Sequence, residues 1–294
     1  MNDDIFGIVP PMVTPFDENE ALDEAALQAD VEYLISEAGV HGLAVGGSTG
    51  EGHTLTTDEL RRAVGTAVEA AANRVPVIAG IIVDSTKQAI ERSRALADLN
   101  VAALQVTPVH YLFRPTDEAL LRHFATIAEA VNIPIIIYNV VPWVYCSPQL
   151  LTRIIDEVPG VIGVKQSAGD LKMLADLLLL CSDRGRIMSA VDALMYPSFA
   201  LGAHGAIAAI LTAVPTLCVQ LWDAVQAGDH AQALQLHQRL LPVWNAIMDD
   251  NLPANVKYAM RWQGRDGGIP RAPMPSSSAT QQANIQNSLQ AALQ

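Results

Sequence analysis

Short apolar runs alternate with longer amphipathic segments almost from one end of the chain to the other. Each run is only a few residues long and rich in Val, Ile, Leu and Ala, which is typical of parallel strands that are dry on both faces. The expected strands are residues 7–13, 42–46, 77–81, 101–106, 133–138, 161–165, 186–190 and 205–210. The expected helices between them are residues 23–38, 57–73, 85–99, 117–131, 148–157, 170–182 and 193–201. Residues such as Thr56 and Ser85 begin helices in the way that capping residues do.

Regular repetition of strand and helix predicts an α/β fold, a closed (β/α)8 TIM barrel. The alternative is an open doubly wound sheet, but such sheets usually have fewer strands, and no GxGxxG sequence follows the first strand. Helical patterns continue after the eighth strand, over residues 214–226, 229–248, 253–261 and 280–293. We therefore expect residues 1–212 to form the barrel and residues 213–294 to form a C-terminal helical extension packed on it, within one structural domain.

Composition excludes several classes of protein. Half of the 294 residues are hydrophobic and 17% are charged, which suits a large buried core. The net charge of −13 argues against nucleic acid as a partner, because phosphate binding relies on Lys and Arg. Three cysteines without CxxC spacing and an acidic N-terminal segment predict a cytoplasmic protein without disulfides. No run reaches the roughly 20 apolar residues that span a membrane. The seven scattered histidines predict no metal or other cofactor.

Chemically capable residues follow three of the expected strands. The second strand runs into Gly-Ser-Thr-Gly-Glu at residues 47–51, the fifth ends at Tyr138, and the sixth ends at Lys165. In barrel enzymes the active site lies at the carboxyl ends of the strands. These residues are therefore expected to face one mouth.

Lys165 is the most informative residue in this group. Burial at the end of an apolar strand favours the neutral amine, which is the form that attacks a ketone to give an imine. The alternative is a lysine that extends to solvent from the strand end. Tyr138 could move protons or be a core ring with a solvated hydroxyl. The turn at residues 47–50 could bind a carboxylate through its amides and hydroxyls, or simply connect strand and helix.

Taken together, these strand ends resemble the dihydrodipicolinate synthase / N-acetylneuraminate lyase family of pyruvate-dependent class I aldolases and dehydratases. The similarity runs from Gly7 to about Pro275 and rests on the joint spacing of several motifs. They are Val-Thr-Pro-Phe at 13–16, Gly-Ser-Thr-Gly-Glu at 47–51, Leu-Thr at 55–56, Thr-Pro at 107–108, Tyr-Asn-Val at 138–140, Gly-Val-Lys at 163–165, Asp-Ala-Leu at 192–194 and Ala-Leu-Gly-Ala at 200–203.

The resemblance implies a role for each matching residue. Lys165 would form the imine with a small 2-oxo acid, and Tyr138 would shuttle protons with help from the Ser48 hydroxyl. Thr49 and nearby amides, including that of Gly47, would hold the substrate carboxylate.

A second group of expected contacts lies farther from the lysine. The family's proton relay is completed by a tyrosine from a neighbouring subunit; Tyr111 is the candidate here, with His110 one register away. Ile207 and Trp143 are the other expected substrate contacts. The resemblance also implies a homotetramer built as a dimer of dimers.

Departures from the family pattern bear on the second substrate. Lysine-pathway synthases carry an arginine shortly after the tyrosine motif, whereas here Trp143 follows Pro142 and no arginine is present. Sialic acid lyases carry an Asp-Glu pair and a downstream serine, whereas here Ala193 follows Asp192 and Ala209 takes the serine position. We therefore expect aldol cleavage or condensation of a 2-oxo-4-hydroxy acid, or dehydration of a 2-oxo-3-deoxy sugar acid. A dihydrodipicolinate synthase, a non-catalytic 2-oxo-acid sensor and a metal-dependent class II aldolase are the alternatives.

Overall fold

A computed structural model describes residues 5–109, 112–168 and 170–294, and in it eight parallel strands form one sheet in the order β1-β8-β7-β6-β5-β4-β3-β2. The sheet closes between its outer strands, because Met12 N donates to Ala44 O at 2.8 Å and Ala44 N donates to Pro10 O at 3.0 Å. The strands are β1 (Gly7–Ile8), β2 (Leu43–Val45), β3 (Val77–Ile81), β4 (Ala103–Val106), β5 (Ile135–Asn139), β6 (Val161–Gln166), β7 (Arg186–Ser189) and β8 (Gly205–Ala206). The expected (β/α)8 barrel is confirmed.

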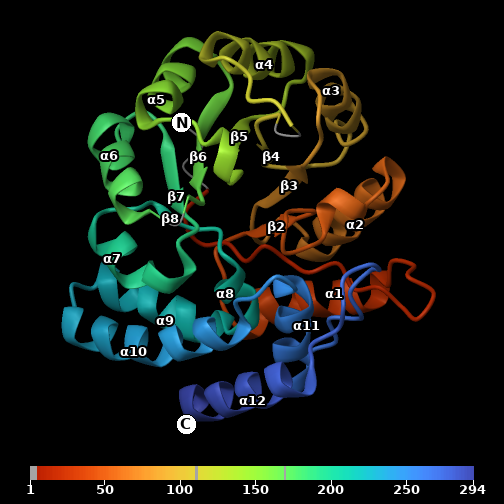
Figure 1. Cartoon of the computed structure of the whole chain (residues 1–294), viewed down its shortest axis with the longest axis vertical. Coiled ribbons are helices and arrows are strands. Elements are labelled where there is room, and N and C mark those ends of the chain that lie inside the picture. The colour runs from red at the N-terminus through yellow and green to blue at the C-terminus, as the bar shows by residue number, and fades with distance from the viewer. Residues whose placement is uncertain (1–4, 110–111, 169) are drawn as a thin grey trace.

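Helices surround the strands, as Figure 1 shows. Those of the barrel are α1 (Glu24–Glu32), α2 (Thr57–Ala71), α3 (Thr86–Arg94), α4 (Asp117–Ala130), α5 (Pro148–Glu157), α6 (Leu171–Cys181), α7 (Met195–Ala200) and α8 (Ala209–Ala213). Each of the first six begins at a Ser, Thr or Asp whose side chain accepts an N–H of the first turn. These caps define where each helix begins, and so where the loop that precedes it ends.

Four more helices follow the barrel: α9 (Pro215–Gln226), α10 (His230–Ile247), α11 (Leu252–Trp262) and α12 (Ala279–Leu293). In Figure 1 they stack on one side of the molecule, next to α1, α7 and α8. In the described part of the chain, no helix is both long and apolar enough to cross a membrane.

Two expected strands are shorter than the sequence pattern indicates. The first was expected over residues 7–13, but regular pairing ends at Ile8, because Pro10 and Pro11 have no N–H to donate. The eighth was expected over residues 205–210, but helix α8 starts at Ala209. A short apolar run does not distinguish a buried strand from a buried helix.

The barrel interior changes character toward the carboxyl ends of the strands. Away from the carboxyl ends, the interior holds a small apolar cluster that includes Ala103 of β4 and Ile136 of β5. Alternate residues of a strand share a face. Gln105 and Tyr138 therefore follow these two residues on the interior face, one step nearer the strand ends, and polar groups replace the hydrocarbon there.

A buried ion pair ties the C-terminal helices to the barrel. Lys257 Nζ on α11 donates to Glu51 Oε1 at 2.6 Å, and both side chains are fully buried. The other Glu51 oxygen accepts the backbone N–H of Arg271 at 2.9 Å. A second buried pair joins Arg265 to Asp30 on α1 at 2.7 Å. The segment that follows α11 is thus held to the barrel at two charged points.

Lys257→Met is expected to lower the free energy of unfolding by about 3–5 kcal/mol, because it leaves the buried Glu51 carboxylate without its positively charged partner. The measurement is denaturant unfolding followed by circular dichroism. Arg61→Met is the control, since it breaks an exposed ion pair with Asp98 and should cost far less. Equal losses in the free energy of unfolding in the two variants would contradict a special role for the buried pair of Lys257 and Glu51.

Candidate active site

A cavity of about 650 Å³ opens at the carboxyl ends of the strands. One wall consists of residues that end or follow strands, among them Ser48, Tyr138 and Lys165. The other wall comes from the junction between α10 and α11, where Trp244 and Met248 contribute side chains. The cavity thus lies where barrel enzymes carry out their chemistry.

Lys165 and Tyr138 lie side by side in this cavity. They are register partners in the parallel pairing of β5 with β6, so both side chains leave the sheet on the same face. Lys165 is only 3% exposed, and its Nζ lies 3.9 Å from the centroid of the Tyr138 ring. The Tyr138 hydroxyl donates to Ser48 Oγ at 3.1 Å. An amine, a phenol and an aliphatic hydroxyl therefore form a continuous row.

Hydrogen bonds hold the turn at residues 47–50, which carries Ser48 and Thr49, in one conformation. Thr14 Oγ1 donates to Gly50 O at 2.5 Å, and Gly52 N donates to Gly47 O at 3.0 Å. A Cβ on Gly52 would lie 1.9 Å from the carbonyl oxygen of Gly46, so this close approach requires glycine. Thr49 is buried and lines the cavity, which brings it into the same site as Lys165.

Asp192 is a partly buried acid that lines the same cavity as Lys165. Burial raises the pKa of its carboxyl from 3.8 to about 6, and a backbone hydrogen bond from Ile210 and the positive charge of Lys165 oppose the rise. The bond is from Ile210 N to Asp192 Oδ1, at 2.8 Å. Asp192 therefore holds the start of α8 as well as lining the site.

The remaining expected contacts differ in their placement. Ile207 lines the cavity, and Gly47 is buried at the start of the turn. Trp143 is 58% exposed, and the described residues that line the cavity do not include it. Tyr111 and His110 lie outside the described residues.

The wall between α10 and α11 is not indicated by any pattern in the sequence. Trp244, Met248, Asp249 and Asp250 all line the cavity, although they lie far along the chain from the strand ends. Nothing in a helical periodicity indicates which helix end reaches over a barrel mouth. Within the described ranges, no group of three or more His, Cys, Asp or Glu is arranged to hold a metal ion.

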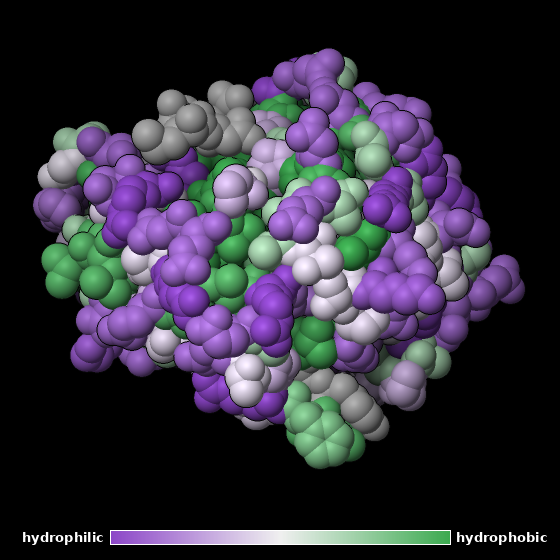
Figure 2. Space-filling view, turned by 90° about the horizontal axis from the view of Figure 1, so that it is seen from above, coloured by the Kyte–Doolittle hydropathy of each residue, from purple (hydrophilic) through white to green (hydrophobic). Residues whose placement is uncertain are grey.

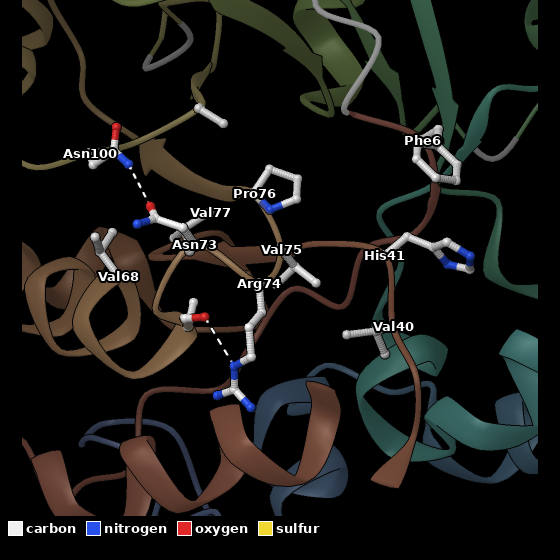
Figure 3. Close-up of a pocket in the computed structure, with 12 residues that line it drawn as sticks. Phe6, Val40, His41, Val68, Asn73, Arg74, Val75, Pro76, Val77 and Asn100 are labelled. Atoms are coloured by element: carbon white, nitrogen blue, oxygen red, sulfur yellow. Dashed lines mark hydrogen bonds between the residues drawn. The ribbon is translucent and has the colours of Figure 1, made fainter. Parts of the chain in front are cut away.

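A second cavity, of about 570 Å³, lies at the opposite, amino end of the strands (Figure 3). Its polar side chains pair with protein groups: Asn100 Nδ2 donates to Asn73 Oδ1 at 2.8 Å, and Arg74 forms an ion pair with Glu32 at 2.6 Å. Conserved chemistry in barrel enzymes belongs to the other end. The cavity that contains Lys165 is therefore the candidate active site.

Comparisons with known proteins agree with this geometry. The model of the dihydrodipicolinate synthetase family matches residues 4–292. The chain belongs to the dihydrodipicolinate synthetase family. Members of this family are class I lyases that use a lysine Schiff base, and the chain is an enzyme of that type.

Similar family members come from several organisms. A 4-hydroxy-tetrahydrodipicolinate synthase of Bradyrhizobium diazoefficiens is 38% identical over 273 residues, which cover 91% of this chain and 90% of that one. One from Methanopyrus kandleri is 36% identical over 273 residues, with 92% and 90% covered. The crystal structure of dihydrodipicolinate synthase from Acinetobacter baumannii with pyruvate has a TM-score of 0.91 at 29% identity, covering 98% of this chain and 99% of that one.

Asp192→Asn is expected to change how stability depends on pH. Between pH 3.8 and about 6 the unfolded carboxyl has lost its proton while the folded one still holds it, so the contribution of Asp192 to stability falls as pH rises through this window. The stability of the asparagine variant relative to the native protein should therefore increase from pH 4 to pH 6 and then remain constant. Denaturant unfolding at several pH values measures the free energy of unfolding of both proteins. A difference between them that does not change with pH would refute the prediction.

Proposed function

We propose that this enzyme forms an imine between Lys165 and the keto carbon of pyruvate or a related 2-oxo acid. The contact between Lys165 Nζ, the Tyr138 ring and the Ser48 hydroxyl is the observation that carries the proposal. The amine adds to the keto carbon, the carbinolamine loses water, and the imine then withdraws electrons from the neighbouring carbon. Tyr138 supplies the proton for the departing water and accepts one from the carbinolamine nitrogen or the substrate carbon.

The substrate carboxylate is proposed to sit on the turn at residues 47–50. Thr49 offers a hydroxyl and a backbone amide there, and successive amides of such a turn attract an anion. Local donors of this kind are needed because the net charge of −13 repels an anionic substrate at longer range. Gly47 and Ser48 complete this part of the proposed site.

The second part of the substrate is proposed to carry hydroxyl groups and no second carboxylate. Asp192, Asp249 and Asp250 line the cavity, and Lys165 is the only Lys or Arg among the described lining residues. Carboxylates accept hydrogen bonds from hydroxyls but repel another anion. This favours cleavage or condensation of a 2-oxo-4-hydroxy acid, or dehydration of a 2-oxo-3-deoxy sugar acid.

A dihydrodipicolinate synthase is the second candidate. The similar curated proteins carry the name 4-hydroxy-tetrahydrodipicolinate synthase, which supports condensation of pyruvate with an acidic aldehyde. The acidic wall between α10 and α11 weighs against it, and so does the stretch 140–145, which contains no arginine directly after the tyrosine motif.

The active form is proposed to be a homotetramer, a dimer of dimers, with Tyr111 reaching a neighbouring site. Leu112 is 66% exposed and Phe113 is 83% exposed in the loop after β4. Figure 2 shows a largely polar surface on which small hydrophobic groups stand out, one of them projecting at the edge. Exposed apolar side chains that lie next to each other favour a contact between proteins.

A cytoplasmic location is proposed from the cysteines. Cys146, Cys181 and Cys218 are all buried as free thiols, which is the usual state in a reducing compartment.

Borohydride reduction in the presence of pyruvate should leave a covalent pyruvate adduct on Lys165, located by peptide mass mapping. Lys165→Arg should form no adduct, because a guanidinium is not a nucleophile at neutral pH. Tyr138→Phe keeps the amine and should form the adduct about 10²–10⁴-fold more slowly, since only proton transfer is lost. A folded native protein that forms no adduct with any small 2-oxo acid would refute the proposal.

Competing aldehydes test the second part of the substrate. With pyruvate present, kcat/KM for glyceraldehyde should exceed that for aspartate semialdehyde by at least about tenfold, equal to about 1.4 kcal/mol. Added salt should narrow the gap, because it screens the repulsion by Asp249 and Asp250. The Asp249→Asn/Asp250→Asn double variant should narrow it as well. A native preference for aspartate semialdehyde would instead identify a dihydrodipicolinate synthase.

A further inference from the structure

Gln105 is an unusual residue for the interior of a barrel. It lies on β4, it is fully buried, and neither its Nε2 nor its Oε1 has a hydrogen-bond partner in the part of the chain that the structure describes. Barrel interiors are normally filled by Val, Ile and Leu. A buried amide without a partner destabilises the folded protein relative to one that is paired. A leucine or methionine here would avoid that cost, so the amide needs an explanation.

Other buried atoms without a partner do not raise the same question. Asp30 Oδ2 is unpaired, but its other oxygen binds Arg265. His123 Nε2 is unpaired, but its other ring nitrogen lies 2.9 Å from the hydroxyl of Thr86. Among the described side chains with such atoms, Gln105 is the one with two. Thr152 Oγ1 is also unpaired, but it lies on helix α5, beside the Cys181 thiol and outside the barrel interior. Gln105 is therefore the residue of this group whose unpaired amide lies inside the barrel.

The position of the amide links it to the active site. Gln105 Nε2 lies 3.4 Å from the point that a Cβ would occupy on Gly47, the first residue of the turn at 47–50. Its register partner on β3 is Gly80, which has no side chain to separate the two. On the other side, β5 carries Tyr138 two residues beyond Ile136, the partner of Gln105. The amide therefore lies next to the turn at residues 47–50 and beside the strand that carries Tyr138, one layer behind the described residues that line the cavity.

We propose that Gln105 is a further substrate-binding residue, whose Nε2 donates a hydrogen bond to the carboxylate of the 2-oxo acid, directly or through one water molecule. The inference rests on the proposed function, because it assumes that the turn at residues 47–50 holds this carboxylate. An amide is suited to the task, since it donates to an anion without bringing a second positive charge next to Lys165. The amide lacks a hydrogen bond in the free enzyme and gains one when the substrate carboxylate binds. It therefore favours substrates that carry a carboxylate at this position.

Gln105→Met is the decisive variant, because methionine has nearly the same length and no amide. Without substrate it should be at least as stable as the native protein, since the unpaired polar atoms are gone. Its Kd for pyruvate should be raised about tenfold, and the increase in melting temperature on adding pyruvate should be smaller. At saturating pyruvate the borohydride adduct on Lys165 should still form. Ile78→Val is the matched control: it changes packing in the barrel interior, and its Kd for pyruvate should be unchanged.

Gln105→Glu provides a second, independent variant. A carboxylate in place of the donor should weaken pyruvate binding more than methionine does, and lowering the pH should restore part of the binding as the new carboxyl gains a proton and donates again. Native affinity for pyruvate in both variants, with the adduct still formed, would overturn the assignment of Gln105 and leave the imine proposal intact. Absence of an adduct in the native protein would instead remove the proposed function on which the assignment rests.

Discussion

The ion pair between Glu51 and Lys257 is the contact on which the geometry of the site depends most directly. Glu51 follows the turn at residues 47–50, and its backbone has a φ of 53°, an unfavourable value for a residue with a Cβ. Lys257 belongs to α11, more than two hundred positions away, and both side chains are removed from water. Two charges buried at this depth tolerate little displacement, because each loses its compensation when the other moves. The turn that carries Ser48 and Thr49 is thereby fixed by a helix outside the barrel.

Register within the sheet provides the other half of the geometry. Parallel pairing places Tyr138 opposite Lys165, and the closed sheet leaves both little freedom to move apart. The two catalytic candidates are therefore aligned by backbone hydrogen bonds, while the turn that faces them is aligned by charge. The main chain therefore sets the relative positions of Lys165 and Tyr138, and their side-chain rotamers only adjust the distance between the amine and the phenol.

Much of this arrangement could be predicted from the sequence, for identifiable reasons. Alternation of apolar runs with capped helices indicates a barrel, and the convergence of strand ends at one mouth brings Lys165, Tyr138 and Ser48 into one site. The end of the eighth strand was misplaced, since Ala209 and Ile210 suit a buried helix as well as a strand. Asp249 and Asp250 were missed, because a loop between two distant helices carries no local signal of what it covers. Gln105 was missed too: a single polar residue in an apolar run reveals its lack of partners only in three dimensions.

The wall contributed by the junction of α10 and α11 has an evolutionary consequence. It lines the same cavity as Lys165 and Tyr138, yet it supplies neither the amine nor the phenol. Under the proposed function, substitutions at Met248 or its neighbours can therefore accumulate while the amine of Lys165 and the phenol of Tyr138 stay unchanged. Such a division lets gene duplication followed by drift in one short loop produce new substrate ranges from an unchanged reaction centre. It also makes this loop the natural place for laboratory evolution to begin.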